Sequence, residues 1–198
     1  MRRQFLVGLM ATISTGAFRS GTATAQTPAA PPTATPAPAP TAAAGPATAA
    51  PGWIDYKPEG GRFRVDLPTL PKIAIVQVPI GNGNTVPMTE ATSIVRQVAY
   101  VASYVDYPAT VTKGAAAEVI LNQVRNGAGT GATIRDEKKL QLGRAEGREY
   151  TVVQSNGTVA ITRTYWSRGR LFQLVAEGKP GVETQAATRH FLESFALV

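Results

Sequence analysis

The sequence predicts an α+β domain that consists mainly of an antiparallel sheet with flanking helices. Segments of alternating or β-branched residues recur throughout residues 52–198, which is typical of strands. Asn156-Gly157 separates two of these segments, and this dipeptide is the strongest short signal for an antiparallel hairpin. Apolar residues recur at helical spacing in 113–126 and near one stripe in 182–193, so two helices are expected to flank the sheet.

The first half of the domain is expected to contribute three strand regions and one helix. Residues 62–67 alternate polar and apolar side chains and stop at Pro68, which predicts a strand. The other two strand regions are a dense β-branched run at 72–80, followed by a loop or turn at 81–84, and a long run of β-formers at 91–107 that ends at Pro108. The helix at 113–126 is followed by Gly127 and Gly129, which act as stop signals.

The second half is expected to form a strand at 133–142 and then a meander. A two-residue turn at Asn156-Gly157 would pair Val152 with Ile161, and a second turn at Arg168-Gly169 would pair Tyr165 with Phe172. The predicted core face of this meander comprises Val152, Val159, Ile161, Tyr165, Phe172 and Leu174. The predicted opposite face comprises Glu149, Thr151, Thr162, Thr164 and Gln173, with Trp166 and Leu171 near one end. The helix at 182–193 and an apolar end at 195–198 close the domain.

Residues 1–25 have the pattern of an export signal. Basic residues precede an apolar segment that is too short to span a bilayer, and the expected cleavage site lies between Ala25 and Gln26. The residues that resemble the twin-arginine export motif are Arg2, Arg3, Phe5 and Leu6. The alternative is a general secretory signal that happens to carry two arginines. Both routes lead out of the cytoplasm, so we expect a bacterial protein that is periplasmic or secreted.

Residues 26–51 are predicted to be a disordered linker. Apart from Gln26 and Gly45 they contain only alanine, proline and threonine, with eight prolines. Such a composition cannot build a packed core and favours an extended, polyproline-like tether. A single globular domain is therefore expected to span residues 52–198.

Composition excludes several classes of protein. The chain has no cysteine, which excludes a disulfide framework, a thiolate nucleophile and a lipid-carrying cysteine. Removal of three signal-peptide arginines leaves 17 basic and 13 acidic side chains, a net charge near +4. This charge is too small and too dispersed for a nucleic-acid binder. No segment after the signal approaches the roughly 20 apolar residues that a transmembrane helix needs.

The sequence contains no residues that we identify as catalytic, cofactor-binding or metal-ligating. Sites built from cysteine and histidine are excluded by number, since His190 is the only histidine and there is no cysteine. We expect His190 to lie on the helix surface or at the core edge, because a general base needs a nucleophile and an orienting acid within reach. Residues 127–131 resemble a phosphate-binding loop, but they follow a helix and lack the required Lys-Ser/Thr. The carboxylate pairs Asp136/Glu137 and Glu146/Glu149 are interpreted as solvated faces.

Several turn and core positions resemble those of PsbP-like domains. They are the tryptophan-led start, the segment 61–68, Tyr107-Pro108 before a helix, the segment 143–149, and the closing segment 191–195. The resemblance covers nearly all of residues 52–198 and implies the α/β/α sandwich that the photosystem II extrinsic subunit shares with the Ran-binding Mog family and several bacterial envelope proteins. It includes no catalytic signature, so it implies a fold and not an activity.

These observations lead us to expect a non-enzymatic envelope domain that binds a periplasmic protein partner or assists a complex. Two alternatives stay open: a binder of anionic polymer or lipid headgroups through surface arginines, and a hydrolase whose active site contains only oxygen-bearing side chains. The candidate partner surface is Trp166, Arg168, Arg170 and Leu171, because tryptophan and arginine are enriched at binding hot spots. The opposing interpretation is that a helix covers Trp166 and Leu171 and that the arginines are solvated turn charges.

Overall fold

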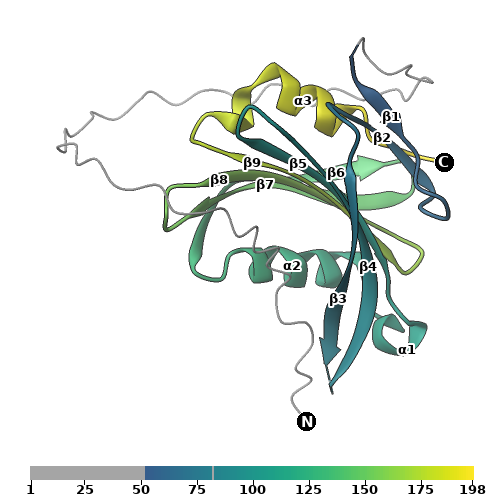
Figure 1. The fold of residues 1–198 in the computed structure, drawn as a ribbon. Helices are drawn as coiled ribbons and strands as arrows, with labels where there is room; N and C mark the ends of the chain where they lie inside the picture. The colour runs from purple at the N-terminus through teal and green to yellow at the C-terminus, as the bar shows by residue number, and fades with distance from the viewer. Residues whose placement is uncertain (1–51, 82) are drawn as a thin grey trace. The chain divides into compact units, whose positions relative to one another are not determined.

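Two antiparallel sheets organise the chain from residue 52 onward (Figure 1). This computed structural model describes residues 52–81 and 83–198, so the signal-peptide and linker predictions lie outside the described residues. The larger sheet has seven strands in the order β3-β4-β5-β9-β8-β7-β6, and the smaller sheet has three in the order β1-β2-β10. The predicted α+β class, a mainly antiparallel sheet with flanking helices, is confirmed.

The large sheet is a sequence of hairpins with one crossover, from β5 through two helices to β6. Its strands are β3 (Lys72–Gly81), β4 (Asn84–Val95), β5 (Val98–Asp106), β6 (Ala132–Leu142), β7 (Ala145–Gln154), β8 (Val159–Ser167) and β9 (Arg170–Gly178). The strands of the small sheet are β1 (Ile54–Tyr56), β2 (Phe63–Leu67) and β10 (Ala196–Leu197). The helices are α1 (Ala109–Thr112), α2 (Ala117–Ala128), the short 3-10 helix η1 (Val182–Thr184) and α3 (Ala186–Glu193).

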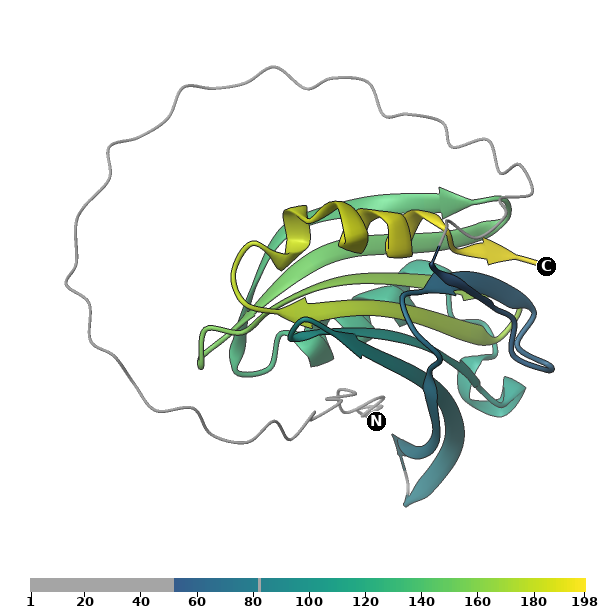
Figure 2. The same ribbon diagram turned by 45° about the horizontal axis from the view of Figure 1, so that its top comes forward.

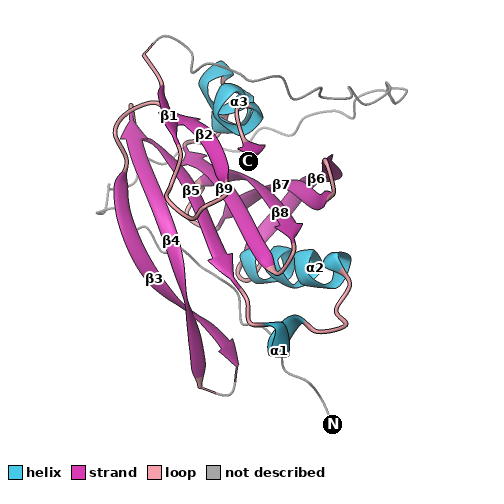
Figure 3. Ribbon diagram, turned by 90° about the vertical axis from the view of Figure 1, so that its right-hand side faces the viewer, coloured by secondary structure: helices cyan, strands magenta, loops and turns pink. Residues whose placement is uncertain are grey.

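The large sheet is covered on both faces (Figures 2 and 3). On the α3 face, α3 and the small sheet bury the largest apolar cluster, which includes Phe63, Ile161, Tyr165, Phe172, Phe191 and Phe195. On the α2 face, α2 buries two smaller clusters that include Met88, Leu121, Leu171, Tyr150 and Val152. Because successive side chains of a strand point to opposite faces, central strands that are covered twice become apolar on both sides.

The register of the meander corrects one prediction and confirms another. The backbone N–H of Gln154 donates to the carbonyl of Thr158, which leaves a three-residue loop at 155–157 with Gly157 at φ 84°. Val153 therefore pairs with Val159 and Val152 with Ala160. A shift of one residue moves side chains to the other face. Val152 is therefore on the α2 face, and Glu149 and Thr151 are on the α3 face, opposite to expectation. The turn at Arg168-Gly169 has two residues, and the predicted Tyr165–Phe172 pair is confirmed.

Three element boundaries differ from the sequence prediction. The run at 91–107 contains parts of two strands, because Arg96 and Gln97 adopt positive φ values of 50° and 66° and form a tight turn. The helix expected at 113–126 begins at Ala117, after the separate short helix α1. The closing helix is divided into η1 and α3 at Gln185, whose backbone is extended.

Candidate protein-binding surface

The predicted partner surface on the β8–β9 hairpin is largely buried. Trp166 pairs with Leu171 across the ladder on the α2 face, as expected. Leu171 is only 2% exposed, and the ring of Trp166 lies 5.9 Å from the ring of Tyr107. Both side chains belong to the apolar cluster beneath α2. Leu171 is therefore a core residue and does not contribute to a free surface.

Arg170 is also buried, and its guanidinium is fully engaged. It donates to both carboxylate oxygens of Asp106, at 2.6 and 2.5 Å, and to the carbonyl oxygens of Gly60 and Gly61, both at 2.6 Å. These hydrogen bonds hold the pKa of Asp106 below its ordinary value, against the opposing effect of burial. Arg170 thus fastens the turn before β2 to β5 and β9. Of the four predicted residues, Arg168 alone is exposed, and Trp166 is partly exposed.

His190 lies at the edge of the core, as predicted, but its partner is remote in sequence. Its Nε2 lies 2.9 Å from Oδ2 of Asp66, a buried residue of β2, and its ring packs 4.6 Å from the ring of Trp53. The Oγ of Ser194 accepts a hydrogen bond from the backbone N–H of Asp66 and donates to the carbonyl of Phe191. Ser194 therefore serves the backbone and is not aligned as a nucleophile for His190, so this group fastens α3 to β2.

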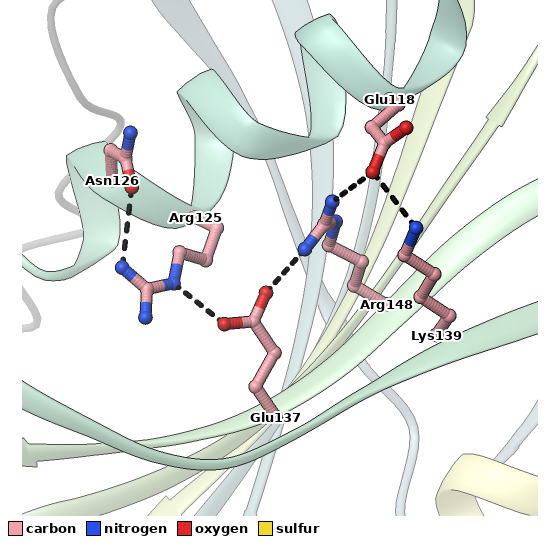
Figure 4. Close-up of polar contacts among 6 residues, drawn as sticks. All are labelled: Glu118, Arg125, Asn126, Glu137, Lys139 and Arg148. Atoms are coloured by element: carbon pink, nitrogen blue, oxygen red, sulfur yellow. Dashed lines mark hydrogen bonds and ion pairs between the residues drawn. The ribbon is translucent and has the colours of Figure 1, made fainter.

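A network of charged side chains lies between α2 and the strands β6 and β7 (Figure 4). Arg148 of β7 donates to Glu137 at 2.5 Å and to Glu118 at 3.4 Å. Arg125 donates to Glu137 at 3.0 Å, and Lys139 donates to Glu118 at 2.9 Å. Desolvation opposes ionisation of Glu137, but the two arginines outweigh it and lower the pKa of this carboxyl. The hydrogen bond from Lys139 likewise lowers the pKa of Glu118.

This network borders a pocket of about 100 Å³. Pockets that hold small-molecule ligands usually measure about 300–1,000 Å³. A general acid needs a carboxyl whose pKa is raised towards neutrality, whereas Glu118 is held in its ionised form. The arrangement is therefore suited to fastening α2 to the sheet.

The two carboxylate pairs singled out in the sequence do not form joint sites. Glu146 pairs with Trp166 on the α2 face, whereas Glu149 pairs with Arg163 on the α3 face, so the sheet separates them. Glu149 is 4% exposed and accepts hydrogen bonds from Arg163 and from Arg189 of α3, and Lys138 lies 2.9 Å from it. Desolvation opposes ionisation of Glu149, but Arg163 and Lys138 outweigh it and lower the pKa of this carboxyl. In the other pair, Asp136 is exposed at a bulge while Glu137 belongs to the network of Figure 4.

The exposed apolar side chains gather at the opposite edge of the sheet, on β3 and the residues next to it. Of seven large exposed apolar side chains among the described residues, five are in this region: Leu70, Ile73, Ile75, Val76 and Ile94. Residues 72–77 are all exposed, and β3 is hydrogen-bonded to one strand only, β4. We call Ile73, Ala74, Ile75 and Val76 the β3 edge. It carries apolar side chains on both faces of a strand whose outer side has no neighbouring strand within residues 52–81 and 83–198.

Sequence reasoning recognised β3 as a strand but did not identify it as a surface. A dense β-branched run is ambiguous, because a strand buried on both faces has the same pattern. Pro79 was the available signal, since proline within a strand occurs mainly at sheet edges, where no ladder N–H is required.

The described residues contain neither a metal-binding cluster nor a candidate membrane span. No group of three or more histidine, cysteine, aspartate or glutamate side chains among them could hold a metal ion. None of the helices in residues 52–81 and 83–198 is long and apolar enough to cross a membrane.

Comparisons with known proteins leave the family of this chain open. No protein-family model matches it, and no curated protein matches it. Among solved structures, cyanobacterial PsbP from Synechocystis sp. PCC 6803 aligns over 80% of this chain and 98% of its own, with 11% identity and a TM-score of 0.47. The Pseudomonas aeruginosa protein PA94, whose function is unknown, aligns over 67% and 86%, with 12% identity and a TM-score of 0.36. Both scores are below 0.5, so neither similarity defines a family.

Proposed function

We propose that this chain is an exported, non-enzymatic domain of the bacterial envelope that binds a protein partner through the β3 edge. One observation carries the proposal: four consecutive apolar residues are exposed on an edge strand that has a free outer side. Exposed patches of apolar side chains mark interaction sites, and a free strand edge supplies backbone hydrogen-bonding groups to a partner. Export is proposed on the pattern around Arg2 and Arg3.

The charged side chains at the opposite edge support binding at β3 instead of binding to anionic polymers. Arg125, Lys139 and Arg148 are bound by two glutamates, Glu118 and Glu137, so most of their charge is balanced within the fold. Binding of lipid headgroups or polysaccharide through surface arginines stays a prediction of the sequence. It would show as affinity that falls steeply with added salt.

Site-specific photocrosslinking in the producing organism tests the proposed surface. A photoreactive amino acid is placed at Ile75 and, as the control, at Val119, an exposed apolar residue of α2 that is 47% accessible. We expect protein adducts from position 75 and none from position 119. Equal adduct yields at the two positions would contradict the β3 edge as the binding surface.

Export is tested separately with a variant in which Arg2 and Arg3 are both lysine. We expect this variant to remain in the cytoplasm as precursor, because the twin-arginine route requires the arginine pair. Normal appearance of a product that begins at Gln26 would show that the general secretory route is used. That outcome would leave the proposed binding surface unaffected.

A further inference from the structure

The outer side of β3 is suited to one kind of ligand, another β-strand. Backbone N–H and C=O groups on this side have no partner strand among the described residues, and a strand pairs with them in register. Ile73 pairs with Ala91, which is in the cluster beneath α3, and Val76 pairs with Met88, which is in the cluster beneath α2. Ile73 and Ile75 therefore point to the α3 face, whereas Ala74 and Val76 point to the α2 face. A strand that covers both rows must itself be apolar on both faces.

We propose that a second copy of this chain supplies that strand, so that two β3 strands pair antiparallel and join two seven-stranded sheets into one. This inference rests on the proposed function and names the partner at the same surface. A two-fold axis perpendicular to the sheet keeps each face of one copy continuous with the same face of the other. With the axis at Ala74, Ile73 of one copy lies opposite Ile75 of the other, and the isoleucines of both copies form one apolar row.

Charge does not oppose this pairing. Lys72 is the one charged residue of β3. In the two-fold register, Lys72 of one copy lies opposite Val76 of the other, so no like charges face each other across the new ladder. The two Lys72 side chains lie at opposite ends of the paired segment, and each stays diagonal to Glu90 of its own copy, because Lys72 pairs with Thr92 and Ala74 pairs with Glu90.

Two other segments of the chain are less suitable than β3 itself as the strand that pairs with the outer side of β3. The free edge of β6 has five consecutive charged residues, 135–139, and a bulge between Arg135 and Lys138, so it cannot present an apolar row to β3. The chain's own residues 26–51 contain eight prolines, which lack the N–H groups that a ladder requires. Antiparallel pairing of β3 with itself also closes after two copies, whereas pairing of β3 with β6 would continue into a fibre.

Sedimentation equilibrium of the purified full chain over a wide concentration range tests the proposal. We expect a monomer–dimer equilibrium, which Ile75→Lys weakens roughly tenfold or more by placing an ammonium group in an apolar contact. Val119→Lys adds the same charge on α2 and is expected to leave the equilibrium unchanged. A chain that stays monomeric at every concentration would overturn the inference.

Further variants test the register. Val76→Glu places a carboxylate directly opposite Lys72 of the other copy, and adding Lys72→Glu to it places like charges opposite each other, so the double variant should associate more weakly than Val76→Glu alone. Ala74→Cys, in a chain that has no other cysteine, should form a disulfide-linked dimer on mild oxidation, whereas Val119→Cys should not. Absence of both this charge effect and the cross-link would overturn the two-fold register.

Sedimentation and photocrosslinking together distinguish failure of the proposed dimer from failure of the proposed binding surface. A monomeric chain whose position 75 crosslinks to a different protein would disprove the second copy as the partner and retain the β3 edge as a binding surface. A monomeric chain without adducts at position 75 would contradict both proposals.

Discussion

β3 and β6 are the two edge strands of the seven-stranded sheet, and they differ in charge, regularity and cover. β6 carries charged residues at 135–139 and a bulge with Asp136 at φ 56°. Several of its side chains form ion pairs with α2 and β7. β3 carries one charged residue, and its irregularity is confined to the end near Gly81.

The difference shows what each edge can do. Charges and bulges are the means by which proteins prevent unwanted pairing at an exposed strand. β6 has both features along its middle, whereas the middle of β3 has neither. A single sheet thus has one edge that is protected against strand addition and one that is open to it, which is why the binding proposals concern β3.

The largest expected effect is on the free energy of unfolding, which should respond differently to a substitution at the sheet centre and at the β3 edge. Ile161 of β8 is 2% exposed and Ile75 of β3 is 69% exposed, so the same substitution can be made at both places. Ile161→Ala should lower the free energy of unfolding by roughly 2–5 kcal/mol. Ile75→Ala should change it by less than about 0.5 kcal/mol. Urea unfolding at low protein concentration measures both, and a comparable loss for Ile75→Ala would show that β3 is packed.

The next effect concerns the bulge that protects β6. Asp136 has a positive φ of 56°, which aspartate tolerates and a β-branched residue does not. Asp136→Val should therefore cost about 1–3 kcal/mol of unfolding free energy. Asp136→Gly, which accepts the same backbone geometry, should cost less. Equal losses for valine and glycine would show that the side chain of Asp136, and not the bulge geometry, stabilises this edge.

A smaller effect is expected from two carboxylates, Glu137 of β6 and Glu149 of β7. The pKa values of Glu137 and Glu149 are lowered in the folded state from their ordinary 4.5, since neighbouring cations outweigh desolvation. Their contribution to stability is complete above pH 4.5 and is lost as the pH falls through the lower folded values. Acid should therefore lower the free energy of unfolding in this pH range, by an amount that solvent screening reduces.

Arg148→Met is the matched variant for this prediction. It removes one of the two arginines that bind Glu137, so the acid-dependent part of the unfolding free energy should shrink. Glu177, whose pKa is raised by burial, changes stability in the opposite direction and is present in both proteins. An unchanged pH profile for Arg148→Met would mean that the network does not stabilise the β6 side.

The smallest effect tests whether exposure alone creates a binding site. Arg168 is exposed at the β8–β9 turn, the accessible part of the surface first predicted from sequence. Arg168→Glu should leave the unfolding free energy within about 0.5 kcal/mol and the monomer–dimer equilibrium unchanged. Weakened association in this variant would move the interface from β3 to the hairpin tip.

The sequence predicted those parts of the fold in which local signals determine the structure. Pro68, Pro108 and Arg168-Gly169 ended or reversed strands where expected. Turn length at Asn156-Gly157 was misjudged, because the same dipeptide fits two-residue and three-residue loops. The turn at Arg96-Gln97 carries no glycine, so nothing in its composition separated β4 from β5.

The functional surface required information that a single segment does not contain. Whether β3 is central or at an edge depends on strand order, which is set by pairings between distant segments. The same applies to Asp66 and His190, which are 124 residues apart, and to Arg170, whose role depends on Asp106, Gly60 and Gly61. The side-chain type of Arg170 suggested a contact with a partner protein. Its buried position instead makes it an internal link between β9, β5 and the turn before β2.

The small sheet has a mechanical consequence. β1 follows residue 52 and β10 ends at residue 197, and both pair with β2, over three and two residue pairs respectively. A pull on residues before 52 therefore reaches β1 first, and a pull on Val198 reaches β10 first. These short ladders would detach before force is transmitted to the seven-stranded sheet. Tension along the chain would then strip the layer over the α3 face while leaving β3 paired to β4.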